Sequence, residues 1–176
     1  MRAHYLAMAR YNRWMNQKLY TLCAGLSDDE RKRDAGAFFH SIHGTLNHLL
    51  LADYAWMRRF TKDSDTYYAR RQDGGPIEVS ALDQILYDDF DALRAERDSV
   101  DALIEKWVEG LSEEDLLMPF SYRTSSGTYE HPLWWAVSHL FNHQTHHRGQ
   151  LTTLLTQLGV DPGVTDLAAM LRAPVP

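Results

Sequence analysis

The chain has 176 residues, which is enough for one domain with a sizeable core, and we expect a single domain over residues 1–176. Its 24 acidic residues outnumber its 18 Lys and Arg residues, and the resulting net charge of -6 argues against phosphate-driven binding of nucleic acids. The sequence contains neither a secretory signal nor an apolar run of about 18 residues, so we expect no membrane partner and a cytoplasmic location.

Helical periodicity of the apolar residues dominates the chain. The first helix should run from about Ala3 to Ala24, and the second from about Phe38 to Thr61. After a polar connection, a third helix should span about Ala81 to Glu109, with Arg97 interrupting its apolar stripe. We expect Arg97 to lay its stem along the core and to extend its charge into solvent.

A short β-hairpin should precede the last helix, because segment Pro119–Glu130 carries strand-forming residues on both sides of Ser125-Ser126-Gly127. The fourth helix should begin near Pro132 and end before Gly159. Trp134-Trp135 could line a pocket mouth, a dimer contact or the core, and the core is our first choice. Four long helices joined by modest loops predict an all-α fold. We expect an antiparallel four-helix bundle with a small hairpin before its last helix.

Four of the nine histidines lie within nine residues of the fourth helix. His147 lies within about 20° of the centre of the apolar stripe and His143 about 55° away, whereas His139 and His146 fall at its boundary. The four-residue spacing places His143 and His147 one turn apart on one face, where two imidazoles can chelate one ion. Core histidines bonded to backbone or carboxylate groups are the alternative, but two at chelating spacing favour a metal.

A stable site needs a third ligand, for which we choose His48 on the second helix. His48 lies about 100° from the apolar stripe of that helix, so periodicity supports it weakly. Asp53 lies on the stripe and is the rival, either as a ligand or as the acceptor of an imidazole N–H from a ligand. Asn47 and Gln144 are candidate helpers beside the ligands, although a structural role is the simpler interpretation of each.

Two segments resemble the histidine motifs of the DinB-like family, the DinB/YfiT-type metalloenzymes. The segment His139–Gln150, HLFNHQTHHRGQ, resembles the C-terminal signature of the family, and Ser41–Asp53, SIHGTLNHLLLAD, resembles its upstream motif. Tyr11-Asn12-Arg13-Trp14 is similar to the pattern of the family's first helix. The resemblance covers most of the chain in the right order.

This resemblance implies a DinB/YfiT-like four-helix bundle with one metal ion held by His48, His143 and His147. It implies that His139 and His146 shape the pocket without being ligands, and that the protein forms a homodimer. Related thiol-dependent enzymes use the metal to bind a low-molecular-weight thiol and carry out S-transfer or isomerisation.

Three histidine ligands leave at least one coordination position open, which is the layout of a catalytic metal site. Zinc or nickel is the divalent ion that we expect, and iron or manganese also fits the ligand count. We therefore predict a metal-dependent enzyme acting on a small molecule, by thiol S-transfer first and hydrolysis second, with its catalytic residues unassigned. The alternatives are a non-catalytic metal-binding stress-response or ligand-binding module, and a bundle whose histidines only fill the core.

Overall fold

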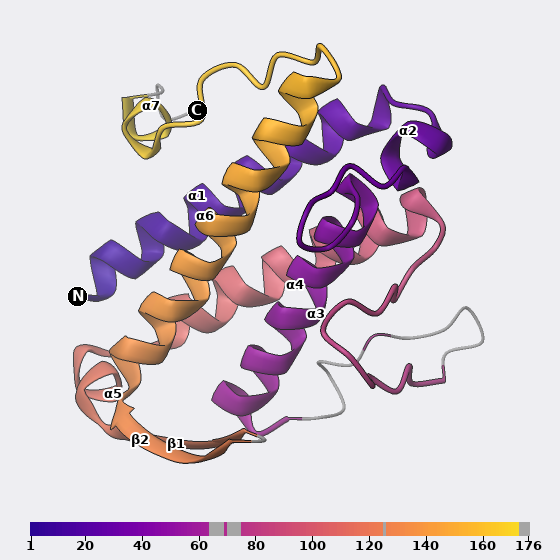
Figure 1. The fold of residues 1–176 in the computed structure, drawn as a ribbon. Helices are drawn as coiled ribbons and strands as arrows, with labels where there is room; N and C mark the ends of the chain where they lie inside the picture. The colour runs from indigo at the N-terminus through magenta and orange to yellow at the C-terminus, as the bar shows by residue number, and fades with distance from the viewer. Residues whose placement is uncertain (64–68, 70–74, 125, 173–176) are drawn as a thin grey trace.

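The computed structural model describes residues 1–63, 69, 75–124 and 126–172 (Figure 1). The described part of the chain is mostly helical, and its helices of 20 residues or more are α1 (Arg2–Ala24), α3 (Ile42–Thr61), α4 (Phe90–Gly110) and α6 (Leu133–Gln157). The shorter elements are α2 (Asp28–Lys32), α5 (Glu113–Leu117), β1 (Pro119–Thr124), β2 (Gly127–Pro132) and α7 (Leu167–Arg172). Among the described helices, none combines the length and apolarity that a bilayer crossing requires.

The long helices pack so that α1 and α3 each contact both α4 and α6. Apolar side chains that are at most 1% exposed fill the space between them, including Leu46, Leu50, Leu93, Ile104, Leu140 and Leu151. Burial of these side chains is the main driving force for folding. The contact between α3 and α6 has a consequence for function, since it brings together the two histidine-bearing segments of the sequence.

The predicted hairpin is confirmed: β1 pairs antiparallel with β2, in a register that matches Phe120 with His131 and Tyr122 with Tyr129. It lies across the neighbouring ends of α3 and α6 (Figure 1). The sequence analysis missed the short helix α5, whose capping box at Ser112 and Asp115 was visible in the sequence.

Helix α4 begins at Phe90, nine residues later than the Ala81 start predicted from the sequence. The Asp89 side chain caps the helix by accepting the N–H of Ala92 at 2.8 Å. Just before this cap, the amide oxygen of Asn47 accepts the N–H groups of Leu86 and Tyr87 at 2.8 and 2.9 Å. These backbone groups bond to α3 instead of to a helix of their own, which is why the periodic pattern overran the true boundary.

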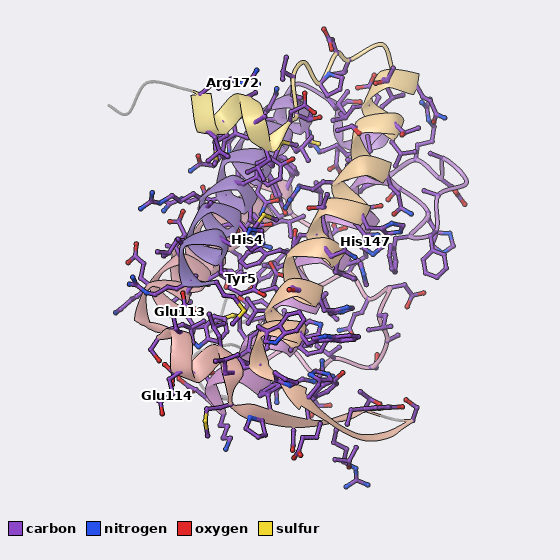
Figure 2. The ribbon with its side chains drawn as sticks, turned by 90° about the vertical axis from the view of Figure 1, so that its left-hand side faces the viewer. His4, Tyr5, Glu113, Glu114, His147 and Arg172 are labelled. Carbon is purple, nitrogen blue, oxygen red and sulfur yellow. The ribbon has the colours of Figure 1, made fainter. Side chains whose placement is uncertain are left out.

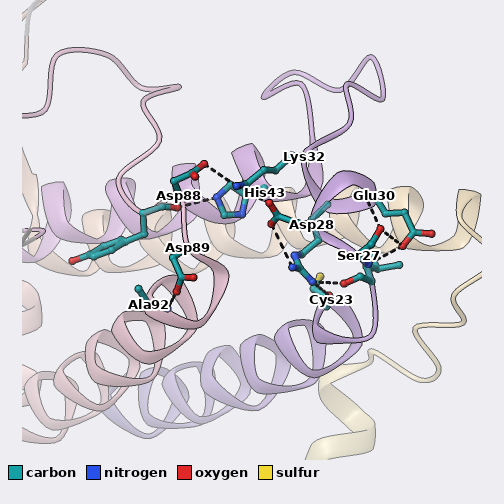
Figure 3. A network of polar contacts seen from close by, with 12 residues as sticks. Cys23, Ser27, Asp28, Glu30, Lys32, His43, Asp88, Asp89 and Ala92 are labelled. Atoms are coloured by element: carbon teal, nitrogen blue, oxygen red, sulfur yellow. Dashed lines mark hydrogen bonds and ion pairs between the residues drawn. The ribbon is translucent and has the colours of Figure 1, made fainter. Parts of the chain in front are cut away.

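Two further contacts hold this pre-helical segment, one against the start of α3 and one against α2 (Figure 3). His43 Nε2 lies 2.9 Å from the carbonyl oxygen of Tyr87. Lys32 pairs with both Asp28 and Asp88 at 2.9 Å. The segment before α4 is therefore fixed beside the turn of α3 that carries His48.

Arg97 is buried, so the prediction that its charge extends into solvent is wrong. The side chain is 2% exposed, with Nη1 at 2.7 Å from Asp53 Oδ2 and Nη2 at 2.9 Å from Asp101 Oδ1. Asp101 also accepts the side-chain N–H groups of Asn12 and Asn16. The two carboxylates compensate the guanidinium inside the core, where an unpaired charge would cost several kcal/mol. We call Asn12, Asn16, Asp53, Arg97, Asp101 and Arg148 the buried charge network, because Arg148 donates to Asn12.

Candidate metal centre

Helices α3 and α6 bring three imidazoles to one place. His48 comes from α3, and His143 and His147 come from successive turns of α6, with His147 projecting from the middle of that helix (Figure 2). One ring nitrogen from each histidine lies within 4.8 Å of the others. The ring centroids are 4.4 to 5.1 Å apart. We call these three residues the histidine cluster.

The spacing of one pair of ring nitrogens suits a tetrahedral ion. His48 Nε2 and His143 Nε2 are 3.2 Å apart. Two nitrogen ligands of a tetrahedral zinc ion, each at 2.0–2.1 Å, are separated by about 3.3 Å. Without an ion, only one of two neutral imidazole nitrogens at this distance can donate a proton to the other. A cation between the two nitrogens would instead accept a lone pair from each of them.

In two of the rings, a hydrogen bond at Nδ1, the nitrogen that points away from the cluster, selects the tautomer. His48 Nδ1 lies 2.8 Å from the Leu82 carbonyl oxygen, and His147 Nδ1 lies 2.7 Å from Gln150 Oε1. Both oxygens only accept, so each Nδ1 carries the proton and each Nε2 presents a lone pair to the cluster. His143 Nδ1 is buried and has no hydrogen-bond partner within the described ranges.

Burial keeps the cluster neutral. Loss of solvation lowers the pKa of His48 and of His147, and it lowers the pKa of His143 to about 3, where repulsion from the neighbouring imidazoles adds to the effect. Neutral imidazole is the form that binds metal ions, so the three rings are ready to coordinate at pH 7.

An aromatic ring covers one side of the cluster. Phe39 stacks on His48 with 3.6 Å between the ring centroids, and its ring lies 5.4 Å from that of His147. Its backbone passes so close to α3 that a Cβ atom at Gly44 would overlap the Phe39 carbonyl oxygen. Glycine at position 44 is therefore needed for the stacking ring to reach His48, a role that the sequence analysis missed.

The three polar residues predicted to assist the candidate ligands have other partners in the structure. Asp53 does not accept the imidazole N–H of His48, because it pairs with Arg97 in the core. Asn47 bonds the segment before α4, and buried Gln144 donates to the Leu49 carbonyl oxygen at 3.4 Å. Both amides thus have structural partners.

The two remaining histidines of α6 lie outside the cluster. His146 is exposed, and its ring lies 4.8 Å from that of His147. His139 lines a cleft that begins one turn from His143. Trp135 lines the same cleft and is 58% exposed, so the assignment of this tryptophan to the core is wrong.

Comparisons with known proteins agree with the histidine motifs. The model of the DinB family matches residues 1–174. The chain is 27% identical over 160 residues to Protein DinB of Bacillus subtilis (strain 168), covering 89% of this chain and 87% of that relative. The crystal structure of a DinB-like protein from Bacillus cereus ATCC 10987 superposes with a TM-score of 0.65 at 20% identity, covering 91% of this chain and 95% of the other, which supports the fold. The chain therefore belongs to the DinB family.

Proposed function

We propose that this protein is a metal-dependent enzyme that binds one divalent ion through Nε2 of His48, His143 and His147. The observation that carries the proposal is the convergence of three ring nitrogens from two helices within 4.8 Å. Two of the rings have their far nitrogen bonded to an oxygen, as ligands of catalytic metals commonly do. Zinc or nickel is our first choice for the ion.

Three ligands leave a coordination position for water or for a substrate. A bound zinc ion would supply a Lewis acid that lowers the pKa of water to about 7 or holds a thiol as its thiolate. The protein's own part is to fix the two tautomers through Leu82 and Gln150, and to exclude water on the side covered by Phe39. We place thiol-dependent S-transfer on a small molecule first and hydrolysis second.

Three further proposals concern the arrangement of the helices, the oligomeric state and the location. The paired contacts among α1, α3, α4 and α6 suit an antiparallel four-helix bundle. A homodimer and a cytoplasmic location stay predictions from the sequence.

A non-catalytic metal-binding module is the second candidate. The stacking of Phe39 on His48 favours it, because that ring closes part of the cluster to solvent. The two candidates differ in whether a water or a substrate atom reaches the ion.

Calorimetric titration of the metal-free, untagged protein with zinc tests the proposal. We expect one equivalent per chain in the wild type. Alanine at His143 or His147 should lower the affinity by more than about 1,000-fold while the circular dichroism spectrum stays helical. His146→Ala is the matched control, because His146 is an exposed histidine on the same helix, and it should titrate like the wild type.

A screen of the zinc-loaded protein with low-molecular-weight thiols and electrophiles tests for catalysis. Activity that survives unchanged in both His143→Ala and His147→Ala would contradict the assignment of the site. Zinc binding without any turnover, together with a closed coordination sphere, would favour the non-catalytic module.

A further inference from the structure

An aromatic cleft is lined by residues of α3, the hairpin and α6. The hairpin lies across the neighbouring ends of these two helices (Figure 1). Its volume is about 520 Å³, within the range of small-molecule sites. Five aromatic residues contribute to its wall: Trp56, Tyr122, Tyr129, Trp134 and Trp135. Trp135 is 58% exposed and Tyr129 43% exposed, so large apolar rings face the open space. A flat apolar ligand would remove this surface from water.

A cation lies against the wall of the cleft in a protein of net charge -6, although Arg59 is not itself a lining residue. The guanidinium of Arg59 lies over the rings of Trp56 and Tyr122, at 4.8 and 5.7 Å from their centroids. Within the described residues, no carboxylate lies at ion-pair distance from Arg59, in contrast to the buried Arg97. The described lining of the cleft includes no acidic side chain. An anionic group on the ligand would supply the carboxylate partner that the described part of the chain does not give Arg59.

The cleft adjoins the histidine cluster. The ring of His139 lies 4.9 Å from that of Trp56 inside the cleft and 5.9 Å from that of His143. His139 and His143 lie on successive turns of α6. A ligand in the cleft would therefore lie beside the turn that carries the candidate ligand His143.

We propose that this cleft binds a flat aromatic small molecule bearing a carboxylate, with the ring stacked on the tryptophans and the carboxylate beside Arg59. We further propose that it is the substrate-binding part of the metal site, a step that rests on the proposed function. The cleft thus assigns a substrate class: aryl carboxylates, or acids with a comparably flat apolar group.

Binding of 2-naphthoate and of its cationic counterpart 2-naphthylmethylammonium to the metal-free full chain tests the ligand class. Isothermal titration should show saturable binding of the anion, about tenfold tighter than that of the cation, because only the anion can accept a charge-assisted hydrogen bond from Arg59; tenfold corresponds to about 1.4 kcal/mol. Equal affinities, or no saturable binding of the anion, would overturn the proposal.

Two arginine variants locate the charge preference. Arg59→Gln should remove the roughly tenfold preference for the anion. Arg123→Gln is the matched control, because Arg123 is an exposed arginine on β1 of the same hairpin. An equal loss in both variants would mean that the anion responds only to the overall field of the protein, and would overturn the assignment to Arg59.

Trp135→Ala tests the aromatic wall and distinguishes a ligand from a second copy of the chain. This exposed side chain can be removed without opening the core, and we expect about tenfold weaker 2-naphthoate binding. Sedimentation should give the same oligomeric state as in the wild type. If the variant instead dissociates a dimer, and if wild-type binding of 2-naphthoate weakens as protein concentration rises, the cleft is a subunit interface and the proposal fails.

The link to the metal has its own readout. In the cobalt(II)-loaded protein, the protons of bound 2-naphthoate should relax faster than in the zinc-loaded protein. Unchanged relaxation, with binding to the metal-free chain intact, would overturn the link and keep the cleft. If zinc titration shows no metal site, the proposed function fails, and 2-naphthoate binding to the metal-free chain still decides the ligand class.

Discussion

The histidine cluster lies on α3 and α6, whereas the buried charge network joins α1, α3, α4 and α6, and the two differ in how their polar groups are satisfied. In the network, Arg97 lies between two carboxylates, and Asp101 also accepts from two asparagines. In the cluster, three neutral rings turn one nitrogen each toward a common point, and those of His48 and His147 present lone pairs. A buried polar group that has its partners contributes structure, whereas converging lone pairs leave room for a cation.

The two regions are nevertheless connected through the helix that they share. Gln144 lies between His143 and His147 in the sequence, and its amide donates to the carbonyl oxygen of Leu49, the neighbour of His48. Arg148 follows His147 and donates to Asn12 on α1. The network side of α6 thus holds the helix in register against α3, and the register sets the separation of the cluster's nitrogens.

The largest effect should come from breaking the network. Arg97→Met leaves Asp53 and Asp101 buried without their cation, and we expect a loss of about 3–5 kcal/mol in the free energy of unfolding. Urea unfolding of the metal-free protein measures it. Arg123→Gln is the exposed control and should change stability by less than about 0.5 kcal/mol. A loss as small as the control's would mean that the network is not structural.

A pair of glutamines on α6 should separate the two regions. Gln150→Leu removes the acceptor of the His147 Nδ1 proton, and we expect zinc affinity to fall by about 10–100-fold with little change in stability. Gln144→Leu, on the network side, should instead lower stability by about 1–3 kcal/mol. Zinc titration and urea unfolding of both variants decide the matter. If the two glutamines exchange these effects, the division of the helix into two sides is wrong.

The smallest effect should be the pH dependence of the cluster without metal. The pKa of His143 falls from 6.5 to about 3 on folding, so the unfolded chain takes up this proton first. The stabilisation from the neutral ring is complete above pH 6.5 and is lost as pH falls toward 3. Because the ring is only half-buried, we expect it to contribute about 1 kcal/mol after solvent screening.

Urea unfolding of the metal-free protein at pH 7 and pH 4 checks this contribution. His143→Gln should show the smaller difference in unfolding free energy between the two pH values. An identical difference in the variant and the wild type would remove His143 from the account of acid stability.

Periodicity predicted the candidate ligands of α6 better than the candidate ligand of α3. His143 and His147 stood out because polar residues occupied an apolar stripe at chelating spacing. His48 lay to one side of its stripe, so periodicity supported its choice weakly, and the motif resemblance then implied the same residue. The reason lies in the segment before α4, where Leu82 contacts His48 and makes that side of α3 an interior surface. A single-helix pattern does not reveal a loop that packs against it.

Other features depended on partners that are distant in the sequence. The periodic pattern showed that Arg97 lies on the apolar stripe, but it did not reveal the two carboxylates that pair with it. In the same way, it did not indicate that Asp53 pairs with an arginine. The Leu82 carbonyl is a backbone group without a residue signature. The contact between Gln150 and His147 could have been predicted from the sequence, since Gln150 lies three residues after His147 on the same helix.

Anomalous diffraction from crystals grown with zinc tests the central claim most directly. The account predicts one peak per chain at the zinc edge, about 2.0–2.1 Å from Nε2 of His48, His143 and His147. The absence of a peak at the cluster, or coordination through Asp53 in place of His48, would contradict it.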